Sequence, residues 1–420
     1  MQNINYFCIV KRFKSILRLP ILVLLLFASG SIYSYAITSS VDSINLAHAD
    51  SAIHIGLLTC QPGQEVYSLY GHTAIHYIHA DKHMDVAINY GTFDFNQPNF
   101  IANFVLGRTD YMMSVIPFGL FCAEYHYEKR GVVEQVLEIP PADKLRFAKA
   151  IEENSRPENL QYRYNFFYDN CTTRARDIAL GRLGKQTDYH RADDGPSFRE
   201  MIHQYTAERP WARMGNDLLL GLQADRPTTI SEQQFLPYNL MDDFDKATIG
   251  PDNHKLVKQT SIIISPFANV VEKEFPLSPT ACAIIVAIII IALTCLEHVR
   301  RTTFWGFDLL LLAIIGLCGV ILAIMLFSQH PTVRINLQIL LLNPMAIVCL
   351  LPVVKREKKG RGHWFWGFYF VCIILFLIGN FVQCYAEGMN ILALSLLFRS
   401  GMRIWTSNKT SKNIHSTKPA

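Results

Sequence analysis

ACAIIVAIIIIALTCL, residues 281–296, is a run in which no side chain carries a charge, and it settles the class of this protein. Further apolar runs follow at residues 307–327, 335–354, 364–384 and 389–398. A buried helix of a water-soluble protein keeps a polar face, whereas a helix that crosses a membrane needs about 20 predominantly apolar residues. The last third of the chain therefore predicts an all-α membrane domain of about five spans over residues 280–405, followed by a tail of residues 406–420.

Charged residues between these runs predict the orientation of the membrane domain. Lysine and arginine are plentiful after the first, third and fifth runs, whereas the other two loops contain only Arg334 and Glu387. Short loops rich in Lys and Arg stay on the cytoplasmic side of a membrane. We therefore expect a multi-pass protein of the bacterial inner (cytoplasmic) membrane, with residues 37–279 in the periplasm and the C-terminus in the cytoplasm.

The N-terminus independently predicts that residues 37–279 are exported. Lys11, Arg12, Lys14 and Arg18 precede a short apolar run at residues 19–27, and small residues come next, up to Ala36. A basic segment, a short apolar segment and a small-residue exit are the three parts of a secretory signal. Residues 1–36 are expected to be a signal peptide, and an uncleaved signal anchor is the alternative.

The exported residues 37–279 indicate an α+β domain. Short apolar or alternating runs favour β-strands at residues 53–58, 73–78, 84–90 and 132–139. Helices are expected at residues 141–154, from Cys171 onward, and near residues 197–205 and 211–222. A domain of this length can bury a hydrophobic core of its own. The net charge of the whole chain, +4, does not indicate a nucleic-acid partner.

Three cysteines, Cys60, Cys122 and Cys171, lie in the exported domain. An odd number leaves at least one thiol unpaired in an oxidising compartment, and pairing of Cys60 with Cys122 stays open. Cys171 stands where a helix is expected to begin. The N-terminus of a helix stabilises negative charge, so this position favours the thiolate, the reactive form of cysteine.

A histidine on a strand is the candidate base for this thiol. His72 follows Gly71 at the mouth of a predicted strand, and a nucleophile–base pair needs spatial proximity and no particular sequence spacing. Asn89, on the next predicted strand, is the best-placed side chain to orient the imidazole. We therefore predict Cys171, His72 and Asn89 as catalytic residues.

Structural roles are the competing interpretation for each of these residues. A lone free cysteine is more often part of a core, but the polar and charged neighbours of Cys171 make a poor apolar pocket. His76 shares a strand face with His72 and is expected to pack or to reach solvent. Zinc binding by His54, His72, His76 and His79 is a weaker alternative because their spacing matches no known metal motif. No metal and no cofactor are expected.

The motifs around these residues resemble a known family. Gly71-His72-Thr73-Ala74 and Asn170-Cys171-Thr172-Thr173 look like the histidine and cysteine segments of the circularly permuted papain-like (NlpC-type) fold. The whole chain is similar to the Lnb family of lipoprotein N-acyltransferases. That likeness runs through segments 59–63 (TCQPG), 89–91 (NYG), 130–135 (RGVVEQ), 164–171 (YNFFYDNC), 210–213 (PWAR), 217–221 (DLLLG), 330–331 (HP) and 343–344 (NP).

The resemblance implies a reaction and its partners. The Cys171 thiolate would take an acyl chain from a membrane phospholipid, and the N-terminal amine of a lipoprotein would then accept the chain from the thioester. His72 would act as the base and proton shuttle, and N–H groups at the helix start would bind the oxyanion. A lipid or amide hydrolase with the same pair, and a non-enzymatic assembly module, are the alternatives.

Further polar residues are candidates for binding the substrates. Three of them surround the cysteine, namely Asn170, Thr172 and Arg174. Others lie in or beside the apolar runs, where polar side chains are costly and often functional: His330, Asn336, Asn343, Asn380 and Arg399. Anchoring of helix ends and hydrogen bonds between helices are the structural alternative for each of this second group. Oligomeric state is not predicted.

Overall fold

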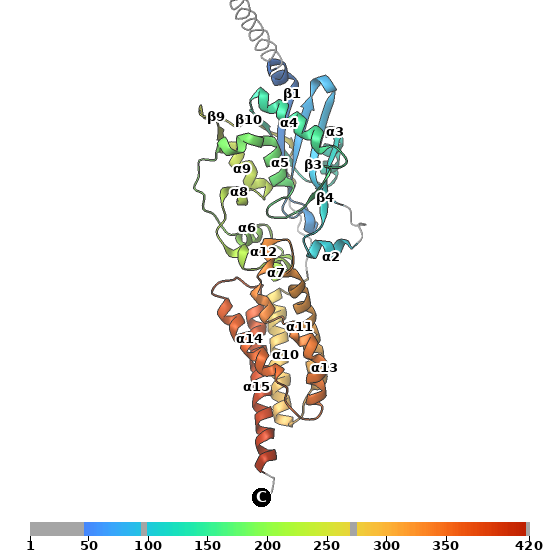
Figure 1. Cartoon of the computed structure of the whole chain (residues 1–420), viewed down its shortest axis with the longest axis vertical. Coiled ribbons are helices and arrows are strands. Elements are labelled where there is room, and N and C mark those ends of the chain that lie inside the picture. The colour runs from blue at the N-terminus through green and yellow to red at the C-terminus, as the bar shows by residue number, and fades with distance from the viewer. Residues whose placement is uncertain (1–45, 94–98, 269–274, 417–420) are drawn as a thin grey trace, which may run out of the picture.

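A computed structural model of the chain describes residues 46–93, 99–268 and 275–416. It consists of an α+β domain followed by an elongated helical domain, stacked end to end (Figure 1). This arrangement confirms the expected fold class. The predicted signal segment, residues 1–36, lies outside the described residues.

The α+β domain is built on a seven-stranded antiparallel sheet with the strand order β10-β5-β1-β2-β3-β4-β6. Its central strands are β1 (Ile53–Cys60), β2 (His72–His79), β3 (Met84–Thr92) and β5 (Val132–Leu137), all at positions that the alternating pattern predicts. The other three were not predicted from the sequence: β4 (Asp110–Pro117), β6 (Gln161–Arg163) and β10 (Val257–Ile264).

Helices cover both faces of this sheet. One face packs on α4 (Pro141–Asn154), α5 (Cys171–Leu180) and α9 (Pro237–Lys246), and the core between them includes Tyr77, Phe147 and Phe244. The other face packs on α3 (Phe118–Tyr127), where Phe121 and Tyr125 are buried. Both α4 and α5 begin where the sequence predicts. Helix α5 lies directly against β2 and β3, which brings its first residue to the ends of those strands.

Smaller elements complete the domain. A second sheet contains β7 (Thr187–Asp188), β8 (Thr248–Ile249) and β9 (His254–Lys255). Helices α2 (Phe100–Val105), α6 (Phe198–Tyr205) and α7 (Pro210–Leu219) lie toward the helical domain, whereas α8 (Ile230–Gln233) lies beside α9 (Figure 1). Helices α6 and α7 correspond to the two predicted near residues 197–205 and 211–222.

In the helical domain, three stretches are long and apolar enough to cross a membrane by length and composition. They are α10 (Pro279–Arg300), α11 (Trp305–Met325) and the stretch Pro331–Glu357. Helix α14 (Phe365–Gly379) is apolar but shorter, and α15 (Met389–Ser416) extends well beyond the run that predicted it.

The third predicted span is not one regular helix, contrary to expectation. Residues 335–354 contain the 3-10 helix η5 (Leu337–Leu340) and most of α13 (Met345–Glu357), and the short α12 (Pro331–Arg334) precedes them. Pro344 lacks a backbone N–H and precedes α13, and the side chain of Asn343 accepts a hydrogen bond from the N–H of Met345. An apolar run sets hydropathy but not helix continuity, so the sequence pattern does not reveal this break.

The two domains are joined through the end of α7. The last carbonyls of a helix have no partner within it. Here the amides of Gln338 and Asn336 donate to the carbonyl oxygens of Asp217 (2.8 Å) and Leu218 (2.8 Å), and Gln383 donates to that of Leu220 (3.2 Å). The helical domain therefore caps a helix of the α+β domain with buried hydrogen bonds.

Gly221 allows this close approach, so we expect Gly221→Ala to weaken the junction. A Cβ at position 221 would lie 2.2 Å from the carbonyl oxygen of Ile335, a backbone atom that cannot rotate away. We expect a lower melting temperature for the purified full-length variant. Gly215→Ala in α7 is the control, because open space surrounds Gly215 and alanine favours helix. Equal melting temperatures for the two variants would contradict this role.

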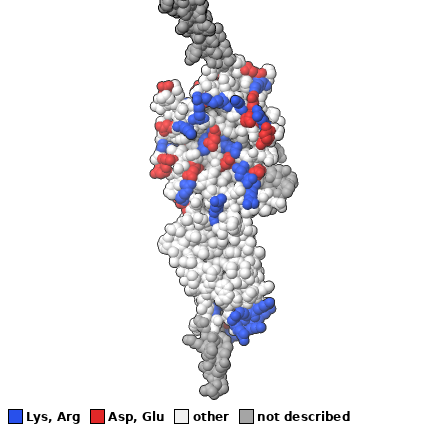
Figure 2. Space-filling model, in the orientation of Figure 1, with Lys and Arg blue, Asp and Glu red and all other residues white. Residues whose placement is uncertain are grey.

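Charge is distributed unevenly over the surface. Figure 2 shows Lys, Arg, Asp and Glu scattered over the α+β domain, a band over the helical domain almost free of them, and a basic patch near the far end. The last turn of α13 at that end carries Lys355 and Arg356, and the α13–α14 connection that follows carries Lys358, Lys359 and Arg361. An uncharged band of this kind is typical of a surface that faces lipid.

Candidate active site

Cys171 is the first residue of α5 because Asn170 caps the helix. The Asn170 side chain accepts hydrogen bonds from the N–H groups of Thr172 and Thr173, both at 3.0 Å, and the Thr173 hydroxyl accepts one from the N–H of Asn170 at 2.9 Å. This reciprocal cap satisfies N–H groups that a helix start otherwise leaves free. It holds the thiol at the positive end of the helix dipole.

His72 begins β2, and its position depends on Gly71. Gly71 has φ +81°, and a Cβ there would lie 2.7 Å from the carbonyl oxygen of Cys60, so only glycine fits. The Nε2 of His72 lies 3.1 Å from the Oδ1 of Asn89 on β3. The ring also forms a hydrogen bond with the Cys171 thiol. Because Asn89 engages Nε2, Nδ1 is the nitrogen left for the sulfur.

Two threonines complete the surroundings of the sulfur. The backbone N–H of Thr73 donates to the Cys171 sulfur. The Thr172 hydroxyl lies 3.7 Å from the Sγ and accepts a hydrogen bond of 3.1 Å from the Thr73 hydroxyl. Both threonines are fully buried. A chain of donors from β2 and α5 therefore points at the sulfur, which favours the thiolate.

The electrostatics of the pair favour a thiolate facing an imidazolium. Burial raises the pKa of Cys171, but the charge and hydrogen bond of His72, with the hydrogen bonds from Thr73 and Thr172, lower it from 9.0 to about 7. Burial lowers the pKa of His72, but the Cys171 charge and the hydrogen bonds to Cys171 and Asn89 raise it overall. A large thiolate fraction at neutral pH is what a cysteine nucleophile requires.

We expect His72→Ala to shift the pH dependence of Cys171 alkylation upward. A depressed thiol pKa gives alkylation that rises through about pH 7 in the native protein. Burial raises the pKa of Cys171, and the charge of His72 is the main effect that opposes it. Without His72, the pH at which alkylation is half-maximal should therefore move to 9.0 or above. Iodoacetamide labelling with peptide mass spectrometry measures this for Cys171 alone.

His76→Ala is the matched control for that measurement. His76 lies on the same strand, but its ring bonds Glu134 (Nδ1 to Oε1, 2.5 Å) and Asp85 (Nε2 to Oδ1, 2.8 Å) instead of the thiol. Its substitution should leave the labelling profile of Cys171 unchanged. Coinciding profiles for the native protein and the His72→Ala variant would show that the pair does not set the thiol pKa.

The three predicted binding residues beside the cysteine have structural partners. Asn170 is the helix cap and also donates from Nδ2 to the carbonyl of Phe235 at 2.8 Å. Thr172 bonds Thr73 as described. Arg174 pairs with both carboxylate oxygens of Asp169, at 2.7 and 2.9 Å. Contact of these residues with a substrate stays a prediction.

His330 and Asn343 lie apart from each other. His330 precedes α12 at the domain junction, where it packs against the turn at Gly107. Asn343 is buried in the helical domain, with its Nδ2 3.6 Å from the Cys372 sulfur. Neither has a hydrogen bond to Cys171 or His72 among the described residues. Their predicted binding role is untested.

The remaining polar candidates are engaged within the helical domain or at its junction. Asn336 belongs to the amide cluster that caps α7. Asn380 accepts a hydrogen bond of 3.3 Å from Asn390. Arg399 is buried among carboxylates. These contacts favour the structural alternative for Asn336, Asn380 and Arg399, in which they anchor helix ends or form hydrogen bonds between helices.

The zinc alternative gains no support from the geometry. His72 and His76 bond different partners, and the His76 ring stacks on Phe118 with 3.8 Å between ring centroids. Within residues 46–93, 99–268 and 275–416, no group of three or more His, Cys, Asp or Glu side chains is arranged to hold a metal ion. Cys60 and Cys122 are both free thiols.

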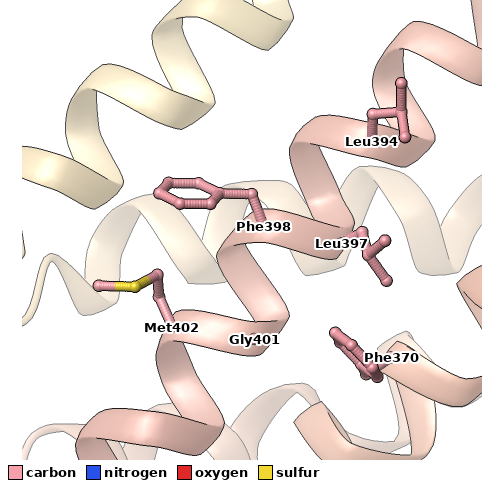
Figure 3. Close-up of a pocket in the computed structure, with 6 residues that line it drawn as sticks. All are labelled: Phe370, Leu394, Leu397, Phe398, Gly401 and Met402. Atoms are coloured by element: carbon pink, nitrogen blue, oxygen red, sulfur yellow. The ribbon is translucent and has the colours of Figure 1, made fainter.

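A groove between α14 and α15 is a separate feature of the molecule. Its cavity of about 360 Å³ is lined by apolar or small residues alone: Phe370, Leu394, Leu397, Phe398, Gly401 and Met402 (Figure 3). No nucleophile or titratable group lines it, so it cannot carry out chemistry. Its lining suits a lipid chain, which any groove on a membrane-facing surface can contact.

Sequence reasoning missed several residues around the thiol. Thr73 and Gly91 lie in segments already singled out, GHTA and NYG, but nothing in their spacing indicates contact with Cys171. Tyr162 lies on the short strand β6, two residues before the YNFFYDNC segment, and carries no recognisable signal. These three approach the site through strand pairing and not through local sequence.

Two sequence models of known protein domains match this chain. The Lnb N-terminal periplasmic domain matches residues 44–204, which include both Cys171 and His72. The Lnb transmembrane domain matches residues 270–411, which include α10 to α14 and most of α15. No curated protein and no solved structure matches the chain. The two matches occur in the expected order and together take in most of the sequence. The chain is a membrane protein with a periplasmic domain, and it belongs to the Lnb family.

Proposed function

We propose that this protein transfers an acyl chain from a membrane phospholipid, through a thioester on Cys171, to the N-terminal amine of a lipoprotein. The observation that carries the proposal is the Cys171–His72 pair, in which hydrogen bonds and charge bring the thiol pKa to about 7. The family resemblance supplies the two substrates. Both are anchored in lipid, and the domain that carries the pair is joined through buried hydrogen bonds to apolar helices.

The first half of the reaction transfers the acyl chain to sulfur. The Cys171 thiolate attacks the ester carbonyl, so a C–S bond forms and the carbonyl electrons move to oxygen. The intermediate collapses, the ester C–O bond breaks, and the lysophospholipid leaves as an alcohol with the proton of the His72 imidazolium. The products are the thioester, neutral His72 and a lysophospholipid.

The second half transfers the chain to nitrogen. The neutral amine of the lipoprotein attacks the thioester carbonyl while His72 accepts its proton, and the C–S bond then breaks to give an amide and the Cys171 thiolate. The imidazolium is restored, so the pair is ready for another cycle. Asn89, through its bond to Nε2, holds the ring in one orientation during both halves.

The proposed location follows from the charges. The basic α13–α14 connection lies at the end of the helical domain farthest from the α+β domain, which contains Cys171 (Figures 1 and 2). The positive-inside rule assigns that end, and the C-terminus, to the cytoplasm of a bacterial cell. The Cys171 domain would then face the periplasm from the inner membrane.

The test uses the purified full-length protein in vesicles of a phospholipid with deuterated acyl chains. We expect the mass of one deuterated acyl chain on Cys171, removable by hydroxylamine. Adding a lipopeptide that carries a diacylglyceryl cysteine with a free amine should discharge it and produce the N-acylated lipopeptide. The same lipopeptide acetylated at its amine is the control. Equal discharge by the acetylated peptide would indicate a hydrolase, and absence of any adduct or product would contradict both enzyme assignments.

A further inference from the structure

Within the part of the chain that the structure describes, a buried phenol beside the thiol has no hydrogen-bond partner. Tyr162 is 8% exposed, and its hydroxyl is fully buried without a donor or acceptor among the described residues. Nearly all buried polar groups in proteins are paired, because an unpaired one loses its hydrogen bonds to water on folding. We therefore expect the hydrogen-bond partner of this buried hydroxyl to be a group that binds to the folded protein.

This hydroxyl lies near Cys171, and Gly91 is adjacent to both side chains. A Cβ at position 91 would lie 3.5 Å from the Cβ of Cys171 and 3.9 Å from the Tyr162 hydroxyl oxygen. The register of β3 against β4 shifts between Asn89 and Thr92, and Gly91 has φ +91°, which favours glycine. The irregular strand and the missing side chain leave space between the thiol and the phenol.

The phenol is held in place by its ring and not by its hydroxyl. The Arg174 guanidinium lies 3.6 Å from the centroid of the Tyr162 ring, and Asp169 holds that guanidinium with two hydrogen bonds. The ring of Tyr90 meets the Tyr162 ring edge-on, with 6.2 Å between centroids. The hydroxyl therefore has a fixed position while its hydrogen-bonding capacity stays unused.

The phenol also stays protonated. Burial raises the pKa of Tyr162, and the negative charge of Cys171 raises it further, against a smaller opposing effect of Arg174. A phenol that keeps its proton beside a thiolate is a hydrogen-bond donor at any pH at which the thiolate forms. A fixed, buried and unpaired donor is the type of group that stabilises an oxyanion with little reorganisation.

We propose that the Tyr162 hydroxyl donates a hydrogen bond to the oxyanion of both tetrahedral intermediates on Cys171. This role rests on the proposed acyl transfer. When the thiolate attacks, the carbonyl oxygen gains a negative charge beside the sulfur, and the Tyr162 O–H donates to it without giving up its proton. The same bond forms when the amine attacks the thioester. Arg174 is then a positioning residue for this phenol.

Tyr162→Phe tests the proposal. It removes one atom that bonds nothing in the free protein, so the melting temperature should not fall. The turnover number for transfer to the lipopeptide should fall on the order of 10²-fold, because the lost bond forms mainly in the transition state. KM should stay unchanged. The pH profile of Cys171 alkylation should also stay unchanged, because the phenol does not act on the thiol.

Tyr90→Phe is the matched control. Its hydroxyl is bonded by Asn154 at 3.2 Å, so the substitution should reduce stability and leave turnover as in the native protein. Native turnover in Tyr162→Phe would overturn the proposal, as would a shifted alkylation profile or a lowered melting temperature. If Cys171→Ala is inactive while Tyr162→Phe is fully active, only the role of Tyr162 fails. If Cys171→Ala is active, the proposed acyl transfer itself fails.

Discussion

Replacing Cys171 with alanine is expected to abolish acyl transfer, with a fall in turnover of at least about 10⁴-fold. Alanine removes the atom that carries the acyl chain, and no described residue bonded to His72 can replace it, since Asn89 is not a nucleophile. Cys171→Ser should be similarly inactive, because a serine hydroxyl does not ionise near pH 7 as this thiol does. The deuterated-phospholipid assay measures both product and adduct.

Cys122→Ala is the control for this experiment. Cys122 is also a free, partly exposed thiol of the periplasmic domain, but it lies on α3, which covers the sheet face opposite α5. Its loss should leave transfer unchanged. Retention of more than a few per cent of activity in Cys171→Ala would rule out the thioester mechanism, whereas inactivity of both variants would point to general damage to the domain.

Replacing Arg399 with leucine is expected to cause the largest loss of stability, about 3–5 kcal/mol, because the buried carboxylates of Asp308 and Glu297 lose a fully buried cation and keep only their ion pairs with Arg403. Arg399 is fully buried, with its Nε 2.7 Å from the Oδ1 of Asp308, which is also fully buried. Its Nη1 lies 3.3 Å from a carboxylate oxygen of Glu297 and donates to the Thr294 hydroxyl at 2.8 Å. Thermal unfolding of the protein in detergent measures the loss.

The cluster around Arg399 connects all the long helices of the domain. It joins α10 and α11 to α15, and Glu357 of α13 accepts a hydrogen bond of 2.8 Å from Trp366 of α14 and lies 3.7 Å from Arg403. Arg399→Leu combined with Asp308→Leu should recover part of the lost stability, because it removes both members of the fully buried Arg399–Asp308 pair. A single variant as stable as the native protein would show that the cluster is not needed for folding.

Parts of the fold could be predicted because their signals are local. Asn170, Thr172 and Thr173 are consecutive or nearly so, and a cap of this kind favours a helix start through local contacts alone, so the first position of α5 was predictable at Cys171. Alternation of apolar residues likewise located β1, β2 and β3. The apolar runs predicted the helical domain, although the break at Asn343-Pro344 was missed.

Edge strands and capping partners were not predictable in the same way. Strand β6 has three residues, too few to show a periodic signal. Strand β10 pairs with β5, which lies more than one hundred residues earlier in the chain, so this pairing has no local signal. Gln338 and Gln383 look like isolated polar residues among apolar ones, although they bond carbonyls at the end of α7. Their partners are decided by docking of the two domains.

Local sequence was enough to show that a thiol begins a helix, that a histidine begins a strand, and that both belong to a domain next to apolar helices. Only the folded chain shows that the thiol and the imidazole meet, that Arg174 supports Tyr162, and that Arg399 pairs with carboxylates. The physical reason is the separation along the chain between the residues that interact. Caps and periodicity depend on residues a few positions apart, whereas contact between residues 72 and 171 depends on strand order and on how α5 packs against β2 and β3.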